Sequence, residues 1–347
     1  GDTAGLAQGL RLEALALGQL GRIPESIALA QDAIRLARTV DDLDTYSAAL
    51  SDAAAMYRAQ GELATSWSLS KLALEAVEPL GDPMATAFFS SAHGVDDFLR
   101  GDWRAARQRM QHAVAVAEGI GPSWVAAYPL ADLGLLNLVE GRAELGLTQL
   151  DKALEFAIND NDMQAQRLIQ APLAEYDLLR GDAVGAIRRL EPLIDHSGHG
   201  DKESAVLLPL LCRAYVAQGQ LDLAASALEA CQRQATASGA QLVLLDALLS
   251  GATLRISHSN LAQAAALLDQ AITQARAMGH PYAEAKAFSL RGSVLAQRGD
   301  IAGARASYGE ALNRFGALGE RLYASIAVAQ LRRLDGPPRS SGSNRFV

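Results

Sequence analysis

The chain has 347 residues, a formal net charge of −8 and a pI near 5.3. This acidic balance argues against a nucleic-acid-binding surface, and no apolar run approaches the roughly 18 residues that a membrane span needs. Half of the residues are apolar but only 5% are aromatic, so the apolar content is mostly Ala and Leu, which favour helices. Two cysteines, Cys212 and Cys231, do not make a disulfide framework. We therefore expect a soluble, cytoplasmic, helical chain.

A turn residue recurs along the chain every 40 residues, with one interval of 38. Glycine can close a helix in the left-handed conformation without a Cβ clash, and a period in this range is typical of repeat arrays. The sequence therefore predicts eight copies of one unit in a single solenoid over residues 1–334. The predicted turn residues are Gly21, Gly61, Gly101, Gly141, Gly181, Gly219, Ser259 and Gly299.

Each unit is predicted to hold two antiparallel helices, because small residues recur at fixed distances from the turn and allow close helix packing. Between units, Gly-Asp-Pro at 81–83 and Gly-His-Pro at 279–281 supply helix stop and start signals. A capping helix is expected over about 321–334 and a disordered tail over 335–347. The small residues seven positions before the turns are Ala14, Ala54, Gly94, Gly134, Ala174, Cys212, Ala252 and Gly292.

This arrangement resembles the tetratricopeptide repeat over nearly the whole chain. The matching positions are the small residue late in the first helix, the turn residue, and two small residues in the second helix. The resemblance implies an all-α, right-handed superhelix of about eight helix-turn-helix repeats with a C-terminal capping helix. The usual unit has about 34 residues, so the extra residues here are expected to lengthen both helices.

No motif for catalysis or cofactor binding is found: the chain has no phosphate-binding loop, no zinc-protease motif, no nucleophile elbow and no Cys-x-x-Cys pair. His196 and His199 have the spacing of two metal ligands but no further Cys or His nearby, which favours a solvated loop. Cys212 and Cys231 fall at small core positions and are interpreted as reduced packing residues. We predict no enzyme activity, no metal and no cofactor.

In the tetratricopeptide register, the first helix of each unit lines the concave surface at positions 13, 10, 6, 3 and 2 residues before the turn. In the middle units these positions form an apolar groove with few charges, and exposed apolar surface typically marks a binding site. The alternative is that the longer helices turn these residues into the core. The predicted partner-binding residues are Phe88, Ser91, Val95, Phe98, Tyr128, Ala131, Leu135, Leu168, Glu175 and Arg213.

The chain also resembles the C-terminal repeat region of bacterial STAND-type regulators, which include MalT-like transcription activators. The stretches that carry this likeness are 121–130, 178–182, 189–193 and 279–285. It implies a non-catalytic sensor that binds a protein, a peptide or a small-molecule inducer, without direct contact to nucleic acid or membrane. The alternatives are a free-standing adaptor or co-chaperone, and the sensory part of a cyclic-nucleotide signalling enzyme. The flanking gene sequence separates the three.

Overall fold

The computed structural model describes residues 2–120, 124–194 and 202–334, and all regular secondary structure in these ranges is helical. This confirms the predicted all-α class. The tail at 335–347 lies outside the described residues. The elements are α1 (Thr3–Gln19), α2 (Ile23–Thr39), α3 (Leu43–Ala59), α4 (Leu63–Val77), η1 (Glu78–Leu80), α5 (Pro83–Arg100), α6 (Trp103–Ile120), α7 (Trp124–Val139), α8 (Ala143–Asn159), α9 (Met163–Leu179), α10 (Ala183–Leu190), η2 (Glu191–Leu193), α11 (Lys202–Ala205), α12 (Leu208–Ala217), α13 (Leu221–Ser238), α14 (Gln241–Ser257), α15 (Leu261–Met278), α16 (Pro281–Gln297), α17 (Ile301–Leu318) and α18 (Leu322–Leu334).

All eight predicted turn residues have the left-handed backbone conformation, with φ from 56° at Ser259 to 89° at Gly101. Each turn joins the two helices of one unit, and α11 and α12 together form the first helix of the sixth unit. The small residues bring the paired helices into direct contact. In the first unit Ser26 Oγ, on the second helix, donates a hydrogen bond of 2.6 Å to the Ala14 carbonyl oxygen of the first. The predicted fold class, a series of helix-turn-helix repeats with a C-terminal helix, is confirmed.

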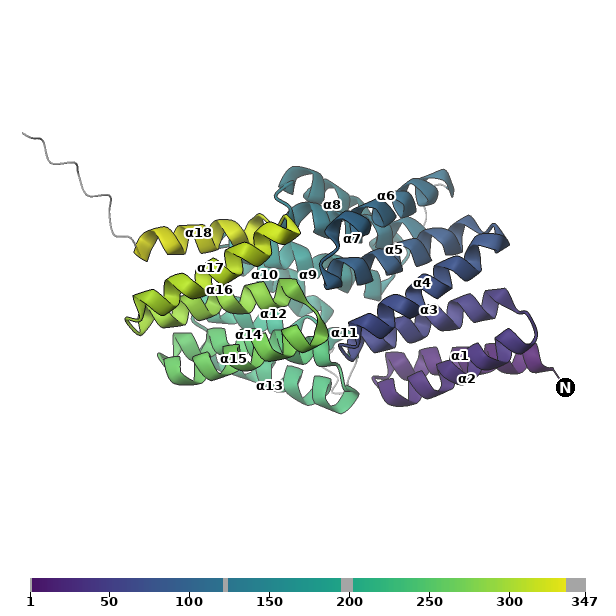
Figure 1. The fold of residues 1–347 in the computed structure, drawn as a ribbon, viewed down its shortest axis with the longest axis horizontal. Coiled ribbons are helices and arrows are strands. Elements are labelled where there is room, and N and C mark those ends of the chain that lie inside the picture. The colour runs from purple at the N-terminus through teal and green to yellow at the C-terminus, as the bar shows by residue number, and fades with distance from the viewer. Residues whose placement is uncertain (1, 121–123, 195–201, 335–347) are drawn as a thin grey trace, which may run out of the picture.

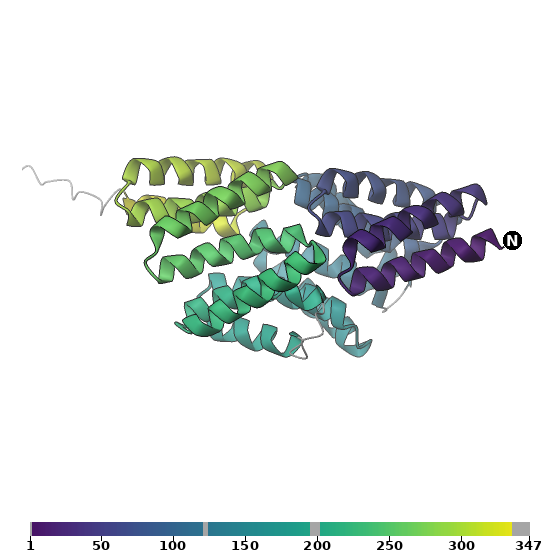
Figure 2. The ribbon, with the colours of Figure 1, turned by 90° about the horizontal axis from the view of Figure 1, so that it is seen from below.

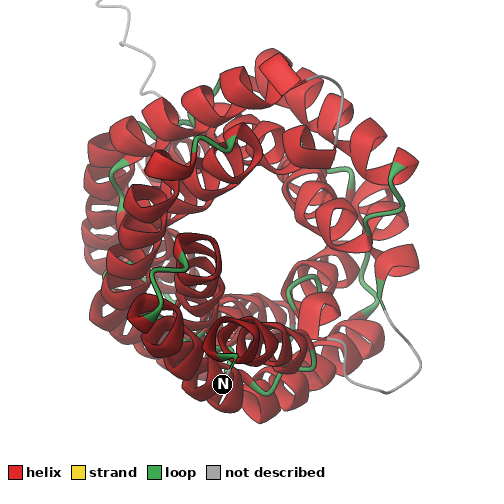
Figure 3. Cartoon of the chain, turned by 90° about the vertical axis from the view of Figure 1, so that its right-hand side faces the viewer, coloured by secondary structure: helices red, strands yellow, loops and turns green. Residues whose placement is uncertain are grey.

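The units stack into a superhelix that appears as a ring when viewed from the N-terminal end (Figure 3). The first helices of successive units contact one another along the series α1, α3, α5, α7, α9 and again along α12, α14, α16, α18. The second helices pack mainly against their own partner and the next unit. The first helices therefore form the inner layer and the second helices the outer layer, as in tetratricopeptide-like solenoids.

The superhelix contacts itself after about one turn. Helix α3 packs against α14, α5 against α16, and α7 against α18, so the N-terminal and C-terminal units lie side by side in Figures 1 and 2. The backbone N–H of Arg321 donates to the carbonyl oxygen of Val139 at 2.7 Å. A Cβ atom on Gly101 would lie 2.6 Å from Pro281 Cγ. The backbone at Gly101 is therefore packed directly against the first residue of α16, in the next turn of the superhelix.

This closure corrects the prediction that Phe98 lines a binding groove. Phe98 is 7% exposed; its ring stacks on Trp103 at 5.0 Å and meets Tyr282 edge-on at 6.0 Å. The physical reason is that the C-terminal end of α5 is covered by α16 of the next superhelical turn. Leu135 packs against the same core, and Ala131 is 2% exposed in a neighbouring core. These three positions are core, as in the alternative interpretation.

Candidate functional site

The first helices of units one to five enclose a cavity of about 320 Å³ on the inner side of the superhelix. We call it the N-terminal cavity. Five of the ten predicted partner-binding residues lie in its wall: Phe88, Ser91, Val95, Tyr128 and Leu168. The other wall residues are Leu15, Gln19, Ser51, Asp52, Ala55, Met56, Arg58, Ala92, Asp132 and Gln164.

One side of the N-terminal cavity is apolar and accessible. Phe88 and Leu168 are 36% and 41% exposed, and the Phe88 ring meets the Tyr128 ring edge-on at 5.9 Å. The three residues each lie 13 positions before the turn of their unit, so α5, α7 and α9 place them in consecutive units of the inner layer. Tyr128 is further fixed by a hydrogen bond from its hydroxyl to Asp162 Oδ2 at 2.9 Å.

The other side of the cavity is polar and acidic. Asp132 on α7 is 9% exposed and accepts a 2.7 Å hydrogen bond from Ser91 Oγ on α5. Burial raises the pKa of Asp132 to about 6, against the smaller opposing effects of the Ser91 hydrogen bond and the Arg58 charge. Arg58 itself is held by Asp96, with Nε 2.7 Å from Oδ1.

A second polar cluster lies further along the inner layer, and we call it the charge cluster. Glu175 Oε1 on α9 accepts hydrogen bonds from Arg213 Nη2 at 3.1 Å, from Lys286 Nζ at 3.0 Å, and from the Tyr323 hydroxyl. Burial alone would raise the pKa of Glu175, but the charges of Lys286 and Arg213 and the Tyr323 hydrogen bond hold it well below its usual range. Because these residues come from α9, α12, α16 and α18, their side chains connect distant units.

The predicted residues therefore divide into three groups: five in the N-terminal cavity, Glu175 and Arg213 in the charge cluster, and three in the core. Sequence analysis missed Asp132, which lies nine positions before its turn, one residue from the position considered. It also missed Lys286, although Lys286 lies 13 positions before Gly299, in the same register as Phe88. The register that selects Phe88 therefore also selects Lys286 in the last unit. No turn follows Tyr323 in the pattern, so no register places it.

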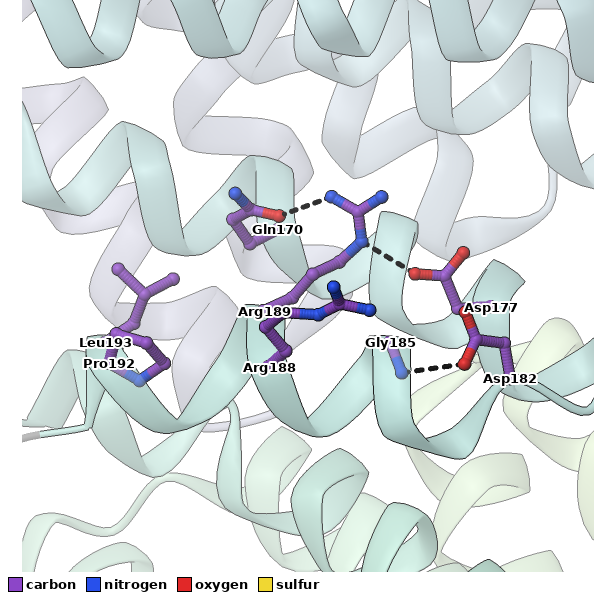
Figure 4. A pocket seen from close by; sticks show the side chains of 8 residues that line it. All are labelled: Gln170, Asp177, Asp182, Gly185, Arg188, Arg189, Pro192 and Leu193. Atoms are coloured by element: carbon purple, nitrogen blue, oxygen red, sulfur yellow. Dashed lines mark hydrogen bonds and ion pairs between the residues drawn. The ribbon is translucent and has the colours of Figure 1, made fainter.

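A larger groove of about 510 Å³ lies between α9, α10 and η2 (Figure 4). Two of its charged side chains are paired with each other, since Arg189 Nε lies 2.6 Å from Asp177 Oδ2. An equivalent groove lies 80 residues earlier, where Arg109 Nε contacts Asp97 Oδ2 at 2.7 Å. The groove is thus a recurrent product of the repeat geometry, and it carries no functional assignment.

Other candidates from the sequence have no active-site geometry. His196 and His199 lie outside the described residues, and within those residues no group of three or more His, Cys, Asp and Glu side chains is arranged to hold a metal. Cys212 and Cys231 are buried and free, and burial raises the pKa of their thiols to about 11 and about 12. No helix in the described part of the chain is long and apolar enough to cross a membrane.

No protein-family model matches the chain, and no curated protein matches it significantly. Solved structures do share its fold. The Rap conjugation gene regulator of plasmid pLS20, solved with the Phr* peptide, superposes with a TM-score of 0.62 at 13% identity over 96% of this chain and 97% of its own. A Rap protein complexed with competence and sporulation factor superposes with a TM-score of 0.56 at 12% identity, over 96% of this chain and 98% of its own.

A chain of the APC/C hetero-tetramer Cut9–Hcn1 gives a TM-score of 0.60 at 13% identity, and the present chain, matched over 94% of its length, spans only 55% of that chain. At these identities the comparisons establish the fold alone. The chain is a tetratricopeptide-like all-α solenoid.

Proposed function

We propose that this chain is a non-catalytic receptor domain that binds a peptide or protein segment on its inner surface, at the N-terminal cavity. The observation that carries the proposal is the accessible row of Phe88, Tyr128 and Leu168, which forms an apolar wall opposite a polar one in the same cavity. Aromatic residues in a partly enclosed apolar site are the typical anchors of recognition. The cavity volume falls within the roughly 300–1,000 Å³ of small-ligand pockets, which is room for one or two side chains of an extended peptide.

The comparisons support a peptide over other occupants. Both Rap structures of the same fold were solved with a bound peptide or factor, and they extend over nearly the whole of this chain. A small-molecule inducer is the alternative occupant of the same cavity. It would fill the cavity without reaching the neighbouring inner surface, whereas a peptide would extend along it.

The test uses synthetic hexapeptide mixtures with a fluorescent label, one position fixed at a time, and fluorescence polarisation with the purified chain. We expect mixtures with apolar residues to bind, and the double variant Phe88→Ala with Leu168→Ala to lose about 2 kcal/mol or more of binding free energy. The matched control is Leu145→Ala on the outer helix α8, since Leu145 is 49% exposed but outside the cavity. Binding that is equally strong in the double variant would refute the proposed site.

We further propose that the domain serves as the sensor of a larger bacterial signalling or transcription regulator. The sequence resemblance to STAND-type repeat regions supports this context. The test is the gene sequence on either side of this chain. A preceding nucleotide-binding domain with a phosphate loop would support it, a following cyclase domain would instead favour a cyclic-nucleotide enzyme, and neither would favour a free-standing adaptor.

A further inference from the structure

The N-terminal cavity carries one carboxylate whose charge its surroundings leave unbalanced. Two ion pairs border the cavity: Arg11 Nη1 lies 2.9 Å from Asp52 Oδ2, and Arg58 Nε lies 2.7 Å from Asp96 Oδ1. Each pair is neutral as a whole. Asp132, in contrast, has a hydroxyl as its hydrogen-bond partner and no ion pair among the described residues, so one negative charge remains in the wall.

This charge is poorly solvated by the protein. A buried carboxylate is normally paired with a cation or held by several hydrogen bonds, because transfer out of water is costly. Asp132 is only 9% exposed, and its one hydrogen bond to the described part of the chain is the 2.7 Å contact from Ser91 Oγ. Its raised pKa is consistent with this incomplete solvation. A cationic group entering the cavity would supply the missing counter-charge.

We propose that the N-terminal cavity recognises a cationic group that a peptide carries beside an apolar residue, with Asp132 as the acceptor and Phe88 and Leu168 as the apolar contacts. This inference rests on the proposed function and adds the chemical class of the ligand. The cation has two sources in a peptide, a Lys or Arg side chain and the N-terminal amine. Both donate charge-assisted hydrogen bonds to a carboxylate.

The experiment repeats the hexapeptide screen in two arms, one with free and one with acetylated N-termini, against the wild-type chain and Asp132→Asn. Asparagine keeps the size of the side chain and an acceptor for Ser91, so the fold is expected to survive; circular dichroism checks this. The matched control is Asp246→Asn on α14, because Asp246 is an exposed acid of an inner helix outside the cavity.

The wild-type chain is expected to prefer mixtures with Lys or Arg, or with a free N-terminus, beside an apolar residue. Asp132→Asn should weaken the binding of those mixtures about tenfold or more, as expected for loss of a hydrogen bond between charged groups. The binding of purely apolar mixtures should not change, and the Asp246→Asn control should bind all mixtures like the wild type. If Asp132→Asn weakens binding only in the arm with free N-termini, the N-terminal amine is the source of the cation; equal weakening in both arms assigns the Lys or Arg side chain.

Three outcomes overturn the inference and are distinguishable from one another. Peptide binding that depends on Phe88 and Leu168 but shows no preference for a cation would remove the inference and leave the proposed function intact. Absence of peptide binding, or binding that ignores those two residues, would remove both. A cationic preference that persists fully in Asp132→Asn would assign the recognition to another carboxylate and refute the role of Asp132.

Discussion

Helices α7 and α8 cross at two facing glycines, and we predict that Gly146→Ala destabilises the chain. A Cβ atom on Gly146 would lie 2.8 Å from the carbonyl oxygen of Gly134 and 2.9 Å from the backbone nitrogen of Leu138. Because both are backbone atoms, no side-chain rotation relieves the contact and the helices must separate. Overpacking of this kind costs about 1–3 kcal/mol. Replacing a helical glycine by alanine also stabilises the helix by about 1 kcal/mol, which offsets part of this cost. At the upper end of the overpacking range, the net loss of unfolding free energy is therefore about 2 kcal/mol.

The matched control is Gly309→Ala, in the interior of α17, where an added Cβ would meet nothing within 4 Å. It retains the helix-propensity gain without the clash and should be more stable by up to about 1 kcal/mol. Urea denaturation followed by circular dichroism measures both variants, with midpoints compared at equal slopes. If Gly146→Ala is stabilised as much as Gly309→Ala, the added Cβ costs nothing and the helix crossing is looser than the backbone contacts imply.

Three further predictions concern the core and the two polar clusters. Phe98→Ala should cost about 3–5 kcal/mol of unfolding free energy, as for a buried aromatic. A loss below about 1 kcal/mol would contradict the assignment of Phe98 to the core. Glu175→Gln should cost about 3–5 kcal/mol at neutral pH, because it removes the carboxylate that Arg213 and Lys286 contact, and an unchanged denaturation midpoint would contradict this. Asp132→Asn should be more stable than the wild type by about 3 kcal/mol above pH 6, and the difference should vanish below about pH 4. A difference independent of pH would refute the assignment of the raised pKa.

The sign of the last prediction follows from linkage. Burial raises the folded-state pKa of Asp132 from 3.8 to about 6. The folded state therefore holds its proton more tightly than the unfolded state, and the wild type loses stability as the pH rises between these values. Glu175 behaves in the opposite way, because its pKa is lowered on folding. Its contribution to stability is present above the pKa of the unfolded chain and is lost as the pH falls below it.

The turns and the helix pairing could be predicted because they depend on local chemistry. A residue such as Gly101, with φ of 89°, must tolerate the left-handed region, and that demand repeats every unit. The closure of the superhelix could not be predicted in this way. It brings Trp103 against Tyr282 at 5.4 Å, and no periodic pattern relates residues in different superhelical turns. For this reason the repeat register predicts a groove position for Phe98, whereas the structure places Phe98 in the core.

The candidate site was predictable to the extent that it follows the repeat register. Phe88, Tyr128 and Leu168 share one position in consecutive units, and that position faces the inner side. The acceptor Asp132 lies one residue from a considered position, and a shift of one residue rotates a helical side chain by about 100°. The pairing of Glu175 with Lys286 joins residues 111 positions apart and depends on the superhelical geometry.

The Asp132 carboxylate is expected to lower the stability of the fold at neutral pH and to strengthen the binding of cationic peptides. An asparagine could accept the Ser91 hydrogen bond without a desolvated charge, so folding gains nothing from the carboxylate at neutral pH. Binding sites commonly carry such stability costs, because the group that recognises the ligand is incompletely satisfied without it. A variant that becomes more stable and at the same time loses its preference for cationic peptides would connect the two observations. Greater stability with unchanged peptide preference would show that Asp132 is a strained packing residue and that the cavity selects its ligand by apolar contacts alone.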